Sequence, residues 1–119
     1  MIQFDAASFT KLGLETAGFF KWESYLPSTN IDRFRGLYGP SPEICETVWI
    51  ELQMSDNDDC HIGDDANPLH LLLGLRFLRA YSTERELAGM FKMSEKAVRK
   101  WSGTYAYKIS LLLVDMVSD

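Results

Sequence analysis

The segment from Asn67 to Tyr81, "NPLHLLLGLRFLRAY", is apolar on nearly every side if it is drawn as a helix. Asn67 is a good N-cap, and Pro68 suits the first helical position because a backbone N–H is not needed there. A helix that is apolar all round must be covered by other elements on every side. The segment therefore predicts a central helix, with Arg76 and Arg79 sharing its one solvated edge.

Other helical patterns precede this segment. "SPEICETVWIELQM" begins with Ser41 as a good N-cap, and its apolar residues are expected to share one face, which consists of Ile44, Cys45, Val48, Trp49 and Leu52. Cys45 is therefore expected to be a small core residue and not a ligand. Residues 6–23 have a weaker pattern because two glycines interrupt it. "YLPSTN" predicts a connection, and "IDRFRGLYG" predicts a short helical turn that ends at Gly39.

The last part of the chain contains two more helical patterns separated by a three-residue break. "STERELAGMF" opens with a T-x-x-E capping box formed by Thr83 and Glu86. Ser94 then caps a long helix. Its apolar stripe recurs every three or four residues and consists of Val98, Trp101, Tyr105, Ile109, Leu112 and Met116. No strand pattern competes, so we expect an all-α fold, a compact bundle of about five helices with a long C-terminal helix.

Composition agrees with a soluble globular protein. The chain has 119 residues, of which 46% are hydrophobic and 24% charged, and this length suits one domain. We expect a single helical domain over 1–119, with residues 1–30 as an N-terminal extension and 31–119 as the bundle. Two cysteines make no disulfide framework, which favours an intracellular setting. No signal peptide or membrane span is expected.

The charge is distributed unevenly along the chain. The net charge is −5, which taken alone argues against a nucleic-acid partner. Met1–Asn67 contains 12 acidic and 4 basic residues, whereas Pro68–Asp119 contains 5 acidic and 8 basic residues. The basic residues gather mostly between Lys92 and Lys100. This local excess, at the break between two helices, favours DNA binding.

Two helices joined by a short turn form a helix-turn-helix when the second crosses the first steeply, and the second helix can then enter the major groove. Ala88 supplies the small residue where the helices cross. Apolar residues that would lock the crossing are Leu87, Phe91, Met93, Val98 and Trp101. The turn usually carries glycine, but Lys92 stands at that position. A lysine there would cost about 1 kcal/mol, so we expect the turn to be built differently.

The helix-turn-helix hypothesis assigns roles to named residues. Lys96 and Arg99 would face base edges, with Arg99 the best candidate for a two-pronged contact to guanine. The phosphate contacts would come from Lys92, Ser94 and Lys100, with Thr83 and Arg85 as lesser candidates. Glu95 either accepts from cytosine or favours the helix dipole, and we favour the dipole. A plain solvated face is the alternative for each of these charges.

Three other features have structural explanations. Trp101 resembles a stacking platform for a base, but its place in the apolar stripe favours core packing. The loop "DNDDCHIGDD" resembles a calcium loop, yet Cys60 and His61 stand where an oxygen ligand and glycine are needed, and zinc lacks a second ligand pair. We therefore expect a solvated acidic loop, no metal and no cofactor. His70 is expected to be a hydrogen-bonded structural histidine.

Two segments together resemble a known family. "RFRGLYGPSPEICETVWIEL" and "NPLHLLLGLRFLRAYSTERELAGMFKMSEKAVRKW" are similar to the N-terminal region of Harbinger-like DDE-superfamily transposases of algal and other protist genomes. That family has a short F/R-rich turn and G-x-S-P-x-x-C-x-x-x-W, then P-x-H-L-L-x-x-L-x-F-L-x-x-Y-x-T-E and a helix-turn-helix ending in R-K-W. The resemblance runs from Arg33 to Trp101 and does not cover the residues before Ile31.

The resemblance implies a domain that binds the terminal sequences of a mobile element, and a nuclear location if the source is eukaryotic. In the family, a following catalytic domain uses three carboxylates to hold two Mg²⁺ ions for strand transfer. Because no strands are visible here to carry such a site, we expect no catalytic domain and no enzyme activity in this chain. It would be an excised domain, a truncated gene or a domesticated DNA-binding module.

A second function stays open from the residues alone. "ISLLLVDMV" in the last helix carries more apolar residues than one buried face requires. Leu111, Leu113 or Val117 could therefore dock a partner, a second copy of the chain or the missing catalytic domain. The alternative to a DNA-binding domain is thus a helical protein-interaction or dimerisation module.

Overall fold

The computed structural model describes residues 2–63 and 66–117, with the side chains of the last helix described as far as Leu112. These residues form six α-helices, one 3-10 turn and no strand. The elements are α1 (Ala6–Thr16), η1 (Trp22–Ser24), α2 (Pro27–Tyr38), α3 (Pro42–Met54), α4 (Pro68–Ala80), α5 (Glu84–Phe91) and α6 (Glu95–Val117). The predicted all-α class is confirmed, with one more helix than expected.

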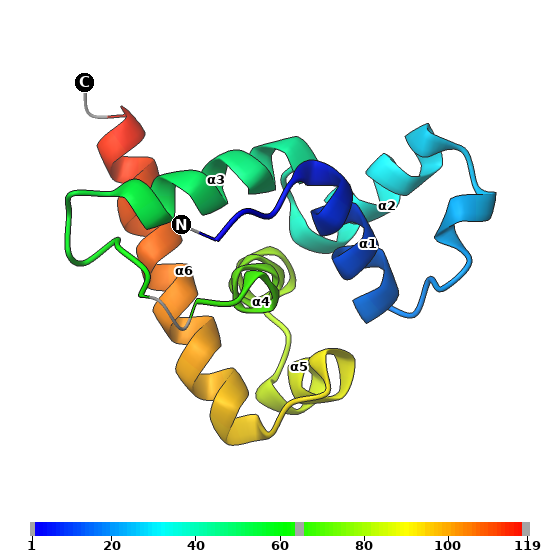
Figure 1. Cartoon of the computed structure of the whole chain (residues 1–119). Coiled ribbons are helices and arrows are strands. Elements are labelled where there is room, and N and C mark those ends of the chain that lie inside the picture. Colours follow the sequence, from blue (N-terminus) through cyan, green and yellow to red (C-terminus); the bar gives the residue numbers. More distant parts are fainter. Residues whose placement is uncertain (1, 64–65, 118–119) are drawn as a thin grey trace.

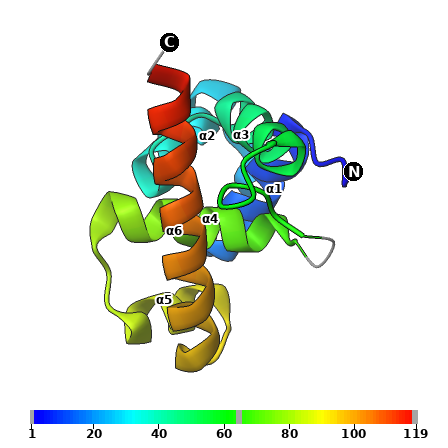
Figure 2. The ribbon, with the colours of Figure 1, turned by 90° about the vertical axis from the view of Figure 1, so that its left-hand side faces the viewer.

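The central helix is α4, as its composition predicts. Figure 1 shows α4 end-on in the middle of the molecule, and it packs against α1, α2, α5 and α6. Figure 2 shows α6 crossing in front of it. Gly74 permits this close crossing, because a Cβ there would lie 2.8 Å from the Tyr105 Cβ and 3.2 Å from the Ala106 backbone nitrogen. Asn67 caps the helix by accepting from the Leu69 N–H at 2.9 Å.

The expectation that Arg76 and Arg79 share a solvated edge is half wrong. Arg79 is exposed, but Arg76 is half-buried and its Nη1 donates to the Leu37 carbonyl oxygen at 3.0 Å. The reason is that α2 covers this side of α4. A guanidinium can be buried there because the end of α2 offers it an acceptor.

The first thirty residues differ from the expectation in two ways. The helix predicted over 6–23 ends at Thr16, because Gly18 adopts a positive φ of 94° and turns the chain. The helix predicted from Ile31 begins at Pro27, inside the expected connection, since proline suits a first helical turn. The sequence predicts an N-terminal extension over residues 1–30. In the structure, α1 of this segment packs against α2, α3 and α4, and Phe9 is fully buried.

The contact between α1 and α2 depends on Gly13. A Cβ at Gly13 would lie 2.5 Å from Cε2 of Phe34 and 2.9 Å from Cε2 of Tyr38. The Tyr38 hydroxyl donates to the Gly13 carbonyl oxygen at 2.7 Å. The glycine that weakens the α1 helical pattern is therefore the residue that lets two buried aromatic rings approach the helix.

The predicted helix α3 is confirmed, and Cys45, Trp49 and Leu52 are buried as expected, whereas Ile44 is exposed because it lies in the first turn at the edge of the apolar face. Ser41 caps the helix by accepting from the Ile44 N–H at 3.3 Å. Cys45 is fully buried among core residues. Burial raises the pKa of the Cys45 thiol from 9.0 to about 12. The thiol is therefore a protonated core group at neutral pH, as the expected core role requires.

Candidate nucleic-acid interface

The break between α5 and α6 is a turn with lysine in the left-handed conformation. Lys92 has φ 55° and ψ 47°, and its N–H donates to the Ala88 carbonyl oxygen. The Met93 N–H donates to the same oxygen at 3.1 Å. The expectation that the turn avoids this geometry is wrong. Two hydrogen bonds to one carbonyl hold Lys92 in a conformation that glycine would adopt with less strain.

The predicted N-caps and the predicted apolar lock are both present, with Thr83 supplying one half of the expected capping box. Thr83 accepts from the Glu86 N–H at 3.1 Å, and Ser94 accepts from the Ala97 N–H at 3.1 Å. Residues buried at the junction are Leu87, Phe91 and Val98, with Ala88, Met93 and Trp101 half-buried against the same core. In both views the two helices run in clearly different directions, so they do not merge into one rod (Figures 1 and 2).

Trp101 packs as its place in the stripe predicts. It is half-buried, and its ring stacks on His70 of α4 with centroids 4.2 Å apart and an interplanar angle of 11°. The Lys100 ammonium lies 4.6 Å from the centroid of the same ring. Trp101 is therefore part of the α4–α6 contact and is not a free platform for a base, while Lys100 borders it on the outside.

Every polar residue proposed for DNA contact is exposed. These residues are Thr83, Arg85, Lys92, Ser94, Lys96, Arg99 and Lys100. They lie at the start of α5, in the turn and in the first two turns of α6. The segment 83–101 also contains the three carboxylates Glu84, Glu86 and Glu95, so its five basic residues leave a net charge of +2. The surface is thus cationic, but less so than the basic residues alone suggest.

An ion pair between the two helices involves Arg99. Its Nη2 lies 2.9 Å from Oε2 of Glu84, and its Nε donates to both carboxylate oxygens at 3.1 and 3.2 Å. The hydrogen bond with Arg99 lowers the pKa of the Glu84 carboxyl, and the same bond raises the pKa of Arg99. Glu84 is not among the predicted site residues, because no local spacing signals a contact between residues fifteen positions apart.

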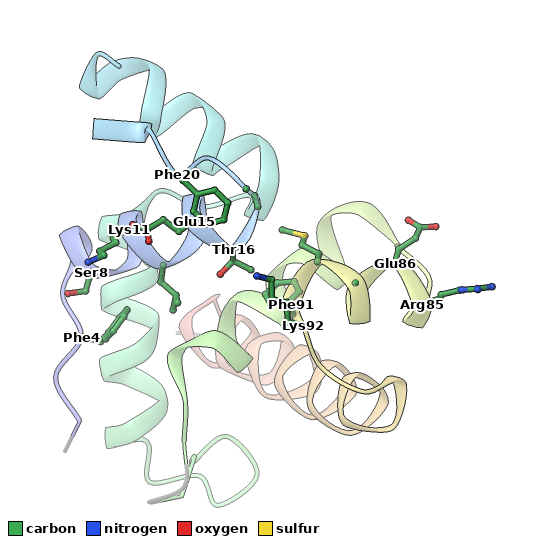
Figure 3. A pocket seen from close by; sticks show the side chains of 15 residues that line it. Phe4, Ser8, Lys11, Glu15, Thr16, Phe20, Arg85, Glu86, Phe91 and Lys92 are labelled. Carbon is green, nitrogen blue, oxygen red and sulfur yellow. The ribbon is translucent and has the colours of Figure 1, made fainter. Parts of the chain in front are cut away.

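A groove of about 1030 Å³ separates α1 from α5. Its apolar lining comes from Phe4, Leu12, Phe20, Met90 and Phe91. Figure 3 shows Lys92 directed into the groove toward Thr16, whereas Arg85 and Glu86 extend away from it. Lys92 thus borders the groove as well as the turn. No sequence pattern predicts this groove, because its two walls are about 70 residues apart in the chain.

The acidic loop between α3 and α4 is only partly solvated. Asp56, Asp58 and Asp59 are exposed as expected, but Cys60 is fully buried. The Lys108 ammonium of α6 donates to the carbonyl oxygens of Asp59 and His61 at 3.1 and 2.8 Å. The loop is therefore anchored to α6. Among the described residues, no three or more His, Cys, Asp or Glu side chains form a group that could hold a metal ion.

Part of the expected apolar strip on α6 can be placed. Leu111 is half-buried, and Leu112 is buried. The side chains of Leu113, Met116 and Val117 lie outside the described residues. None of the helices in the described part of the chain combines the length and apolar character needed to cross a bilayer.

Comparison with known proteins adds no relative. The chain matches no family model, no curated protein and no solved structure. The function must therefore be argued from the geometry of α5, the turn and α6.

Proposed function

We propose that this chain is a sequence-specific DNA-binding domain that places the N-terminal turns of α6 in the major groove. The observation that carries the proposal is the exposed cationic edge at the junction of α5 and α6. Lys96 and Arg99 are three residues apart, so they project from the same side of α6. In a helix-turn-helix, this part of the second helix contacts base edges.

The phosphate contacts would come from the turn and the helix starts. Lys92 projects from the turn, and Lys100 lies further along α6. The Ser94 hydroxyl oxygen accepts from the Ala97 N–H, so its own O–H remains able to donate to a phosphate oxygen. Thr83 and Arg85 lie at the start of α5, which Arg99 contacts through Glu84. The proposed contacts therefore join the start of α5 to the start of α6, with Lys92 at the turn between the two helices.

The resemblance to Harbinger-like transposases supports an origin in a mobile element. On that basis we assign terminal-sequence binding during transposition, in the nucleus of a eukaryotic cell, to this segment. Strand transfer would need carboxylates that hold two metal ions, and we assign no such chemistry to it. One unit would read about half a site, so a second copy or a second module is expected to bind alongside.

Selection from a random pool of DNA duplexes, repeated at two salt concentrations, tests the proposal. Three to five phosphate contacts predict that log K falls against log salt with a slope of roughly −3 to −4. Arg99→Ala is expected to weaken binding to the selected site by about 1–3 kcal/mol and to change binding to random DNA little. Recovery of no shared sequence, with no salt-dependent binding, would reject the proposal.

The protein-interaction alternative predicts a different result. The groove between α1 and α5, with Phe20 69% exposed at its border, favours this second candidate. An interaction module that docks a helical apolar partner there would bind duplexes weakly and show no sequence preference. Phe20→Ser is therefore expected to leave DNA binding unchanged if the leading proposal is correct. If Phe20→Ser abolished sequence-selective binding, DNA binding would depend on the groove between α1 and α5, and its assignment to the junction of α5 and α6 would be wrong.

A further inference from the structure

The ion pair between Glu84 and Arg99 has a definite side-on geometry. Glu84 is the first residue of α5, directly after the cap Thr83. Its carboxylate accepts from Nε and from Nη2 of Arg99, with the shortest distance 2.9 Å to Nη2. Both side chains are accessible, with 69% of Arg99 and 44% of Glu84 exposed. The pair therefore ties the start of one helix to the second turn of the other at the surface.

This geometry occupies only one edge of the guanidinium. Arginine has five N–H donors in a rigid plane. Glu84 takes the Nε–H and one Nη2–H, which lie side by side on the same edge. The two Nη1–H donors and the second Nη2–H remain. One from each nitrogen forms the fork that matches O6 and N7 of guanine.

The Glu84 carboxyl group is held in its ionised form. Glu84 is in the first turn of α5, where the helix dipole favours a negative charge. The hydrogen bond from Arg99 lowers the pKa of the Glu84 carboxyl below its ordinary value. Glu84 is therefore ionised at neutral pH and accepts from the guanidinium through both oxygens.

We infer that Glu84 is a positioning residue that orients the free fork of Arg99 toward a single guanine, and so determines specificity at that base pair. The inference rests on the proposed function, because it assumes that α6 enters the major groove. A long arginine side chain loses rotamer entropy when it contacts a base, and a partner that holds it beforehand reduces that loss. Glu84 would therefore act through Arg99 without touching DNA.

The competing role for Glu84 is simple neutralisation. A carboxylate beside Arg99 repels phosphate and cancels one positive charge, which would weaken binding to every sequence alike. Glu86 is the matched control for this effect. It lies two residues further along α5 and is also exposed, so Glu86→Gln removes the same charge from the same helix.

The experiment measures the Kd of the full chain for the selected DNA site. It also measures the Kd for three versions of that site, in which the same guanine pair is replaced by each of the other three base pairs. Glu84→Gln and Glu86→Gln are both expected to tighten binding to random duplex slightly. Only Glu84→Gln is expected to lower the preference for guanine at one position, by about 5- to 10-fold. Equal preferences in the two variants would overturn the inference and leave neutralisation as the role of Glu84.

A double-mutant cycle and a second arginine variant complete the test. In an Arg99→Ala background, Glu84→Gln is expected to have no further effect on guanine preference, because the fork is already absent. Arg99→Lys keeps the charge without the fork, so it should lose the preference and retain binding to random DNA. An undiminished preference in either arginine variant would overturn the inference but leave sequence-specific binding standing. Failure of the unmodified chain to bind DNA would reject both proposals.

Discussion

Two helix pairs in this molecule use the same residue types for opposite purposes. In the pair α1–α2, the Tyr38 hydroxyl is buried against α1, and the half-buried guanidinium of Arg33 lies 4.7 Å from the ring centroid of Phe19 and 4.4 Å from that of Tyr25, both in the connection between the two helices. In the pair α5–α6, the guanidinium of Arg99 is exposed and is held by Glu84 from one side. The first pair builds the interior, and the second presents charge to solvent.

The comparison teaches that a count of basic residues does not measure a binding surface. Arg33 and Arg76 contribute to the charge of the chain, but one lies against aromatic rings and the other donates to a carbonyl oxygen of α2. Exposed basic residues also lie elsewhere, such as Arg35 and Arg79, but five of them fall close together in the sequence on α5, the turn and the start of α6. The following substitutions test whether the two pairs differ as described.

The largest expected effect separates two helical glycines. Gly13→Ala would push a Cβ into the buried rings of Phe34 and Tyr38, so the free energy of unfolding should fall by about 1–3 kcal/mol. Gly89→Ala in α5 meets no atom within 4 Å and should raise it by up to about 1 kcal/mol through helix propensity. Urea unfolding measures both changes. Similar effects at the two sites would contradict the contrast between the pairs.

The second test compares alanine substitutions of two arginines, Arg33 and Arg99. Arg33→Ala removes a half-buried guanidinium from two aromatic rings and should lower the free energy of unfolding by about 1–2 kcal/mol, with DNA affinity unchanged. Arg99→Ala should weaken DNA binding but change the free energy of unfolding little, because exposed ion pairs contribute little to stability. Thermal unfolding and DNA titration on both variants give the comparison. A DNA defect in Arg33→Ala would show that charge presentation is not confined to α5–α6.

The third test uses the two non-glycine residues with positive φ, Tyr81 and Lys92. Replacing either by glycine relieves left-handed strain and should raise the free energy of unfolding by up to about 1 kcal/mol. Only Lys92→Gly should also weaken DNA binding and reduce the salt slope by about 1. Tyr81→Gly is the matched control, because Tyr81 is 83% exposed at the end of α4. If Lys92→Gly and Tyr81→Gly bound DNA equally well, Lys92 would not contact phosphate.

The smallest effect is the alkaline destabilisation of the interior. The folded state keeps Cys45 protonated with a pKa of about 12, whereas the unfolded chain ionises near 9.0. Unfolding therefore releases a proton above about pH 9, and the free energy of unfolding should fall as pH rises. Between about pH 8 and 9.5 the loss should stay below about 1 kcal/mol.

Urea unfolding of Cys45→Ala across the same pH range isolates this contribution. The variant should be less stable at pH 8 because of the lost packing, but it should lose less stability between the two pH values. Burial also raises the pKa of Tyr38 above its ordinary value of 10.0, and that effect begins only at higher pH. An unchanged pH slope in the variant would mean that Cys45 ionises in the folded state.

The sequence predicts most helix starts because caps are local. Asn67, Thr83 and Ser94 each accept from an N–H two or three residues further on, so their role can be read from neighbouring residues. The end of α1 and the start of α2 were predicted less well. Gly18 and Pro27 are each compatible with a turn or with a helix end, and the choice depends on what packs against them.

The candidate DNA surface was predicted only as a set of exposed residues. The exposure of Arg85, Lys96, Arg99 and Lys100 follows from helical periodicity, because these residues fall away from the apolar stripe, whereas Thr83, Lys92 and Ser94 lie at helix caps and in the turn. Their partners do not follow from it. Glu84 contacts Arg99 only because α5 and α6 meet at a particular angle, and Lys92 borders a groove only because α1 lies opposite.

What the sequence by itself determined is the all-α class, the central place of α4, the caps of α3 to α6 and the break at Lys92. These depend on local capping and on apolar periodicity, which act over a few residues. Only the tertiary structure decided which charges are presented. It half-buried Arg76 and Arg33, and it paired Arg99 with Glu84. The physical reason is that a charged side chain takes its partners from the helices that fold against it, and the spacing along its own helix does not specify them.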